Sequence, residues 1–254
     1  MTRLTAAEFR KLFTTRLWLW MLLASLAWTV GYTALAITFN GGRSGMTPPL
    51  SDAAGQHALF AIGAGGAGPL AAVLAAVGAA GEYRHRTAAA TFLATPRRAR
   101  VVAAKLVTYL LAGGLYTLAC VVASLVVALP WLAAQGRGVP MIGNGNLAVL
   151  GAVIISAALF AVTGAGLGAL VGGQAATVAG LLIYLYIVEP LLSHITAWHS
   201  WTAYLPGVAA DGLTQASQAG VRLLSPWLGG VIFAAWAIAF GAAGLARTVR
   251  RDII

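Results

Sequence analysis

The residue types that most often carry catalysis or bind metal are scarce in this sequence. The chain has four histidines, His57, His85, His194 and His199. None of them has the spacing to a carboxylate that a zinc site requires. Neither Lys11 nor Lys105 follows a glycine, as the phosphate-binding lysine of a nucleotide-binding loop does. Ser44 is followed by glycine one position too early for a nucleophile elbow. We therefore expect no catalytic residue, no metal site and no cofactor on this chain.

Glu189 is the exception to a general absence of ionisable residues within the long apolar runs. A carboxylate costs on the order of 3 kcal/mol at the centre of a bilayer and less near its surface, so it should be paired or face water. Tyr204 and Pro206 follow in a weakly polar segment. We treat Glu189, Tyr204 and Pro206 as candidates for a transport pathway or gate. The alternative is that Glu189 is an interfacial residue beside the helix-ending Pro190.

A second chemically distinctive segment spans residues 82–100, where arginines flank a stretch of helix-forming residues. That stretch carries Phe92 and Leu93, and it ends at Pro96 because the residue before a proline is disfavoured in the α region. A solvated loop whose arginines only set the topology would leave the two apolar side chains without a role. We therefore expect a short helix along the membrane surface that docks another protein. Its contact residues would be Glu82, Tyr83, Arg84, Arg86, Thr87, Phe92, Leu93, Pro96, Arg97 and Arg98.

The overall composition excludes most classes of protein. Only 9 % of the 254 residues are charged, against roughly 25 % in an ordinary soluble domain. With 60 % hydrophobic residues, the chain is neither a water-soluble globule nor a disordered segment. It is predicted to be an all-α integral membrane protein. Its net charge of +10 then reports membrane orientation and not nucleic-acid binding.

Six apolar stretches are long enough to cross a bilayer, for which a helix needs about 20 residues. We place the spans near residues 17–39, 57–81, 101–129, 147–171, 175–192 and 226–246, in a single transmembrane domain covering residues 1–254. The break at Gly172 and Gly173 divides the fourth span from the fifth. The first stretch is about twice as long as a signal-peptide core of ~7–15 residues, so we expect it to be retained.

The basic residues orient these spans. Of the 16 Lys and Arg residues, 13 fall on the side that holds both termini and the segment 82–100, and only Arg43, Arg137 and Arg222 fall on the other. Cytoplasmic loops carry the excess of basic residues. We therefore expect a multi-pass protein of the cell (plasma or inner) membrane with both termini in the cytoplasm.

Two segments outside the spans have patterns of their own. Residues 3–16 predict an amphipathic interfacial helix, started by a capping box at Thr5 and Glu8; the alternative is a basic tail that only orients the first span. Residues 193–225 form a long outer segment of low polarity. It is either re-entrant, with short helices dipping back toward the bilayer, or an amphipathic loop with aromatic residues at the interface.

Glycines predict details of packing within the spans. Gly164, Gly168 and Gly172 recur every four residues, which permits close contact with another helix. The glycine-rich run at 63–69 predicts a kink or local unwinding of the second span.

The motif residues resemble those of the membrane subunit of ABC exporters of the type-2 permease family. The resemblance rests on the run from Glu82 to Thr87, on Thr95-Pro96-Arg97-Arg98, and on Lys105 at the start of the third span. Family members carry glycine where this chain has Arg86. The resemblance implies an N-terminal elbow helix at 3–16 and re-entrant helices between spans five and six. It further implies that residues 82–100 hold the coupling helix, which seats in a cytoplasmic ABC ATPase subunit.

These observations together predict a permease subunit of an ATP-driven exporter. A second permease subunit would complete the pathway, and ATP and Mg would bind on the separate ATPase chain. Walls of Ala, Leu, Val and Gly suit an apolar or amphipathic substrate. One alternative is a membrane anchor or assembly subunit that recruits a cytoplasmic protein and transports nothing. A less favoured alternative is a secondary carrier, because carriers usually need buried titratable groups.

Overall fold

The computed structural model describes residues 2–39, 48–84, 98–195, 199–216 and 221–250, and within them every regular element is helical. The helices are α1 Thr2–Thr14, α2 Leu17–Phe39, α3 Ala53–Gly65, α4 Ala67–Arg84, α6 Arg98–Ala134, α7 Asn146–Val171, α8 Gln174–Ile183, the π-helix η1 Tyr184–Val188, α9 Glu189–Ser193, α10 His199–Thr202, α11 Pro206–Thr214 and α12 Pro226–Arg250. Six helical stretches are long and apolar enough to cross a membrane: Leu17–Phe39, Ala53–Gly81, Ala99–Ala134, Asn146–Val171, Gln174–Ser193 and Pro226–Arg250. The all-α prediction with six spans is confirmed to that extent.

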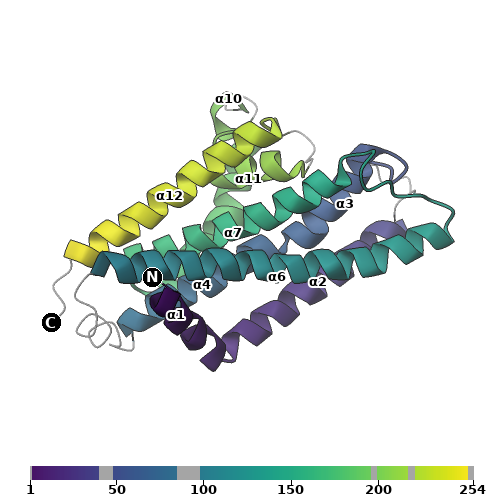
Figure 1. Cartoon of the computed structure of the whole chain (residues 1–254). Helices are drawn as coiled ribbons and strands as arrows, with labels where there is room; N and C mark the ends of the chain where they lie inside the picture. The colour runs from purple at the N-terminus through teal and green to yellow at the C-terminus, as the bar shows by residue number, and fades with distance from the viewer. Residues whose placement is uncertain (1, 40–47, 85–97, 196–198, 217–220, 251–254) are drawn as a thin grey trace.

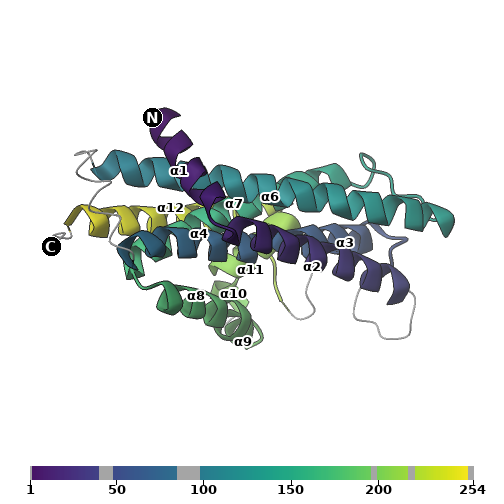
Figure 2. The ribbon, with the colours of Figure 1, turned by 90° about the horizontal axis from the view of Figure 1, so that it is seen from below.

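Helix α7 is the centre of the bundle and packs against α4, α12, α6 and α3. Figure 1 shows α6 running along the length of the molecule, with α1 lying across it. The segment made of α8, η1, α9 and α10 stands to one side of the bundle (Figure 2). The end of α4, the start of α6 and the end of α12 lie at the same end of the molecule (Figure 1).

The second span is broken at Gly66, between α3 and α4, within the run predicted to kink. The indole of Trp28 occupies the space beside this glycine, because a Cβ atom at Gly66 would lie 1.9 Å from Trp28 Nε1. That Nε1 atom donates a hydrogen bond to Ile62 O at 3.3 Å. Pro69 falls in the first turn of α4, where a missing N–H costs little. The break lies at the level of the cavity, which Gly65, Gly66 and Pro69 border.

Close packing of α7 on α4 uses two of the three predicted glycines. A Cβ atom on Gly164 would lie 2.1 Å from Ala72 O, and one on Gly168 would lie 2.6 Å from Ala76 O. Gly172 has a different role, since it ends α7 in the left-handed conformation with φ 75°. The helix-contact prediction thus holds for two positions, and the third glycine is a C-terminal cap.

The fifth span contains the π-helical turn η1 directly before Glu189 and Pro190. Proline has no N–H to donate to the carbonyl four residues earlier, so the α-helical ladder cannot continue unchanged. The backbone N–H of Glu189 reaches back to Tyr184 O, which is the five-residue pattern of a π-helix.

Helix α1 does not start at the predicted capping box. It begins at Thr2, and the Thr5 hydroxyl donates back to Thr2 O at 2.9 Å. Glu8 turns away from the helix N-terminus and pairs with lysines instead. The capping-box interpretation is therefore wrong, because a charged partner on another helix competes for the same carboxylate.

Candidate functional site

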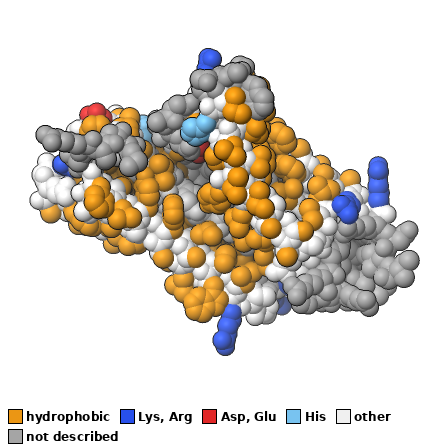
Figure 3. All heavy atoms as spheres, turned by 180° about the vertical axis from the view of Figure 1, so that it is seen from behind, with side chains coloured by type: hydrophobic (Ala, Val, Ile, Leu, Met, Phe, Trp, Pro, Cys, Tyr) orange, Lys and Arg blue, Asp and Glu red, His pale blue; other side chains and the backbone are white. Residues whose placement is uncertain are grey.

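A cavity of about 380 Å³ lies between the break in the second span, α7, α9 and α11. Its walls are mostly apolar, with Trp28 from α2 and Phe160 from α7 supplying aromatic surface. Phe160 is held from behind by Phe233 of α12, with ring centroids 4.7 Å apart in an edge-to-face arrangement. Two acidic residues, Glu189 and Asp211, also border the cavity. Figure 3 shows the face opposite to that of Figure 1, on which hydrophobic side chains predominate and Lys and Arg stand at the margins.

Glu189 connects the fifth span to the first turn of α11. Its side chain is only 3 % exposed, and its Oε1 accepts a hydrogen bond from Val208 N–H at 2.7 Å. Leu205 precedes this helix and provides no side-chain cap, so the carboxylate takes that place at the positive end of the helix dipole. Gly207 allows the approach, because a Cβ there would lie 2.8 Å from Glu189 Oε2.

Of the three residues predicted for a pathway or gate, Glu189 borders the cavity, Pro206 lies next to it and Tyr204 lies away from it. Pro206 is the first residue of α11, and its neighbours Gly207 and Val208 border the cavity with Glu189. Tyr204 does not border it: the ring is 48 % exposed, and the backbone oxygen accepts a hydrogen bond from Trp236 Nε1 at 2.9 Å.

Asp211 was not singled out in the sequence, yet it lies on the cavity one turn beyond Gly207. Burial raises the pKa of the Asp211 carboxyl from its ordinary value of 3.8 to about 8, and the nearby charge of Glu189 adds to the rise. The side chain retains partial exposure because it borders the cavity. A sequence signal existed, since Asp211 is one of only six acidic residues and lies four positions after Gly207 in a weakly polar segment.

The raised pKa of Asp211 predicts a pH-dependent stability. The folded protein binds a proton at Asp211 up to about pH 8, whereas the unfolded chain releases it near pH 4. Unfolding therefore releases a proton between these values, and stability falls as the pH rises through that window. We expect Tm in detergent to be lower at pH 8.5 than at pH 5, and Asp211→Asn to flatten this dependence. Asp52→Asn, which changes an exposed carboxylate, should leave the slope unchanged; equal slopes for Asp211→Asn and the wild type would contradict the assignment.

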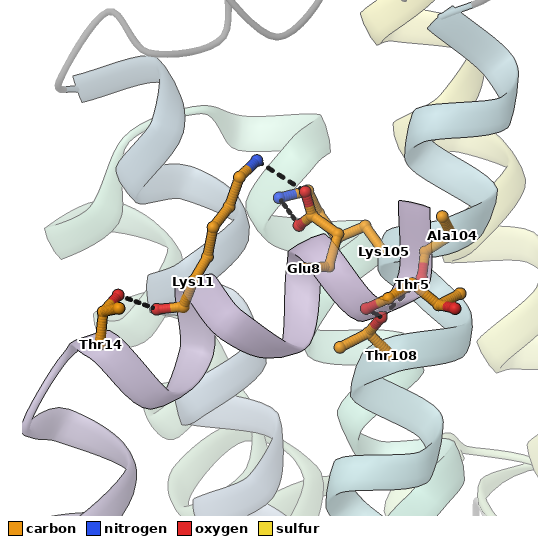
Figure 4. A network of polar contacts seen from close by, with 7 residues as sticks. All are labelled: Thr5, Glu8, Lys11, Thr14, Ala104, Lys105 and Thr108. Carbon is orange, nitrogen blue, oxygen red and sulfur yellow. Dashed lines mark hydrogen bonds and ion pairs between the residues drawn. The ribbon is translucent and has the colours of Figure 1, made fainter. Parts of the chain in front are cut away.

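A buried charge network joins α1 to α6 (Figure 4). Lys105 Nζ lies 2.9 Å from Glu8 Oε2, and Lys11 Nζ lies 2.6 Å from Glu8 Oε1. The Lys105 and Glu8 side chains are 8 % and 7 % exposed, whereas Lys11 is 45 % exposed. Lys105 is two helical turns from Arg98, where α6 begins. The network therefore fixes α1 close to the end of the molecule at which residues 82–100 begin and end.

The predicted docking residues lie mainly outside the part of the chain that the structure describes. Glu82, Tyr83 and Arg84 form the last turn of α4, and Arg98 is the first residue of α6. The remaining six lie outside the described residues: Arg86, Thr87, Phe92, Leu93, Pro96 and Arg97. The structure therefore places the two helix ends from which the segment departs, and these ends lie together (Figure 1).

A network of amides closes the opposite end of the bundle. Gln56 Oε1 accepts hydrogen bonds from Asn146 Nδ2 at 2.7 Å and Asn144 Nδ2 at 3.1 Å. His57 Nε2 and Asn144 O are 2.6 Å apart. These contacts join the start of α3 to the start of α7. His57 is thus held by backbone, and among the described residues no group of His, Cys, Asp and Glu is arranged to hold a metal.

No model of a known protein family matches this chain, and no curated protein matches its sequence. The fold and the site define a class of protein rather than a family. Within its described residues it is all-helical, with six helices suited to crossing a membrane and an apolar cavity bordered by two carboxyl groups.

Proposed function

We propose that this chain is the permease subunit of an ATP-driven ABC exporter, in the cell membrane with both termini cytoplasmic. The observation that carries the proposal is the segment between α4 and α6. Together with the adjoining ends of these two helices, it carries six basic residues from Arg84 to Lys105 and the apolar pair Phe92 and Leu93, more charge than orientation of one loop requires. It leaves and rejoins the bundle at the end where the arginines of α12 also lie.

In this proposal the energy source is a pair of separate ATPase subunits, which hold ATP and Mg and bind residues 82–100 of the two permease subunits. ATP binding can drive transport only if the ATPase subunits bind one permease state better than another. The segment is attached directly to α4 and α6. A rigid shift of these helices would therefore reach both the cavity, which α4 borders at Pro69, and α1, which Lys105 holds. Helix α1 would be the elbow helix at the membrane surface, and α9 to α11 the re-entrant segment.

Affinity capture of the tagged chain tests this proposal. The wild type should retain an ATPase chain carrying the G-x-x-x-x-G-K-[ST] motif, identified by mass spectrometry, together with ATP hydrolysis. Phe92→Ala/Leu93→Ala and Arg98→Glu should each reduce the retained ATPase at least about tenfold, the equivalent of about 1.4 kcal/mol. Ile142→Ala, at the opposite end and 84 % exposed, is the matched control and should retain it in full.

Failure to retain any ATPase would contradict the permease assignment. An ATPase that associates while the reconstituted complex moves no lipophilic compound would favour the anchor or assembly subunit instead.

The acidic pair in the cavity gives the secondary-carrier alternative a specific observation in its favour. Glu189 is buried, Asp211 is half-buried, and the two carboxyl groups are titratable and electrostatically coupled, which is the arrangement that proton-coupled carriers use. Reconstituted vesicles separate the two proposals. Transport that needs ATP and survives a protonophore supports the exporter, whereas transport that needs only a proton gradient supports the carrier.

A further inference from the structure

We propose that the cavity is a binding site for a monocationic amphiphile, with Glu189 receiving the ammonium group and the walls at Trp28 and Phe160 receiving the apolar body. The inference deepens the proposed function, because it names the class of substrate that would use the cavity as its pathway. Binding itself does not require the ATPase partner, so it can be measured on the chain alone.

The first step concerns the hydrogen-bonding capacity of Glu189. One carboxylate oxygen, Oε1, is occupied by Val208 N–H. The other, Oε2, is buried and has no partner at hydrogen-bonding distance within the described part of the chain, although the Gly207 N–H and the Tyr184 hydroxyl also approach the carboxylate. Buried polar atoms are nearly always paired, and an unpaired carboxylate oxygen is among the costliest exceptions. A primary ammonium group carries three donors and can supply the missing bond once the Glu189 side chain turns this buried oxygen toward the cavity that the residue borders.

The second step concerns charge. Of the described residues that border the cavity, none is Lys, Arg or His, while Glu189 and Asp211 are both acidic. The N-terminus of α11 would otherwise attract an anion, but the Glu189 carboxylate already occupies that position. Coupled carboxyl groups at one site do not both ionise readily, so the pair is expected to carry about one negative charge near neutral pH. A ligand with a single positive charge complements it.

The third step concerns the remainder of the ligand. The cavity of about 380 Å³ is within the range that accepts drug-sized molecules, roughly 300–1,000 Å³. Its walls expose more apolar than polar surface, and the Phe160 ring is fixed by Phe233. A compact aliphatic or aromatic body fits such walls, whereas a sugar or a peptide would leave its polar groups unpaired.

A matched pair of probes tests the inference. Phenylbutylamine and phenylbutanol share the same apolar body and differ only in carrying an ammonium or a hydroxyl group. We would measure their binding by equilibrium dialysis to the purified chain in phosphatidylcholine nanodiscs, after subtracting empty nanodiscs. The amine should bind the wild type at least about tenfold more tightly than the alcohol, as expected for one buried charge-assisted hydrogen bond.

Three variants assign the preference to the cavity. Glu189→Gln retains an oxygen for Val208 N–H and should reduce the preference for the amine to about onefold. Gly65→Leu should weaken amine and alcohol alike, because its Cβ meets only Val153 Cγ2, at 4.0 Å, and the larger side chain has room to fill the cavity. Asp52→Asn removes an exposed carboxylate that does not border the cavity and should change neither affinity.

Equal affinities of the wild type for amine and alcohol would overturn the inference, and so would an amine preference that survives both Glu189→Gln and Gly65→Leu. If Glu189→Gln fails to fold, the ratio of the amine and alcohol affinities of the wild type and the effect of Gly65→Leu still test the inference. The ATPase capture described above is independent of these measurements. An amine-selective cavity without an associated ATPase would reject the exporter alone, and an associated ATPase with an unselective cavity would reject only the ligand class.

Discussion

Replacing Glu8 with Met should lower the free energy of unfolding by about 3 kcal/mol, because the substitution leaves the ammonium of Lys105 buried without its carboxylate. The pair joins helices whose residues are 97 positions apart, so it constrains the fold and not merely one helix. Lys11 also contacts Glu8 but is 45 % exposed, and losing that contact returns a flexible side chain to water at little cost. The expected loss therefore resides almost entirely in the Lys105 contact.

Two matched variants test this reasoning. Lys11→Met should cost at most about 0.5 kcal/mol, since it removes the exposed partner of the same carboxylate. The double variant Glu8→Met/Lys105→Met should recover most of the stability lost in Glu8→Met, because an apolar pair of similar size avoids the cost of desolvating two charges. Unfolding in detergent, followed by circular dichroism across a series of SDS concentrations, measures all four proteins. A double variant as unstable as Glu8→Met alone would show that the pair is not the source of the effect.

Limited trypsin digestion provides a second measurement of the same contact. If the ion pair holds α1 against α6, Glu8→Met should expose the peptide bond after Arg16 to cleavage sooner than in the wild type. Cleavage at Arg137, beyond the far end of α6, should keep its wild-type rate and acts as the internal control.

The spans were predictable because the length and the hydrophobicity of a membrane-crossing helix are properties of a continuous stretch of sequence. The break at Gly66 was predictable for a similar reason, as it depends on a local run of glycines. The ends of the spans were harder to predict. Helix α6 extends to Ala134, five residues beyond the expected end at residue 129, because Pro130 lies inside the helix near its C-terminus and does not end it.

Pairs of distant residues were not predictable from the single sequence. Glu8 appeared to belong to a capping box, because Thr5 stands three positions before it and Lys105 is remote in sequence. Glu189 was recognised by its unusual surroundings, but Asp211 was not, since only the return of α11 toward the fifth span brings the two carboxyls to one cavity. Local patterns thus marked Glu8 and Lys105 for separate roles and marked Glu189 without Asp211, and the three-dimensional arrangement was needed to bring the members of each pair together.

Substituting Gly164 with Ala should destabilise the bundle by about 2 kcal/mol, although alanine is the better helix former. The new Cβ atom would lie 2.1 Å from Ala72 O, a backbone atom that cannot rotate away, so α7 and α4 must separate to admit it. Separation loosens packing along the contact, which also includes Gly168 against Ala76, and each lost atomic contact reduces the dispersion energy. Thermal unfolding in detergent measures the loss.

Gly180→Ala is the matched control for this substitution. Gly180 lies within α8, and a Cβ there meets nothing within 4 Å. Alanine should therefore stabilise that helix by about 0.5–1 kcal/mol, so the two glycine-to-alanine changes are expected to have opposite signs. Equal effects would mean that α7 and α4 are not in close contact. Opposite effects would support α4 as a rigid link between the cavity, which it borders at Pro69, and the proposed docking segment, which it reaches at Arg84.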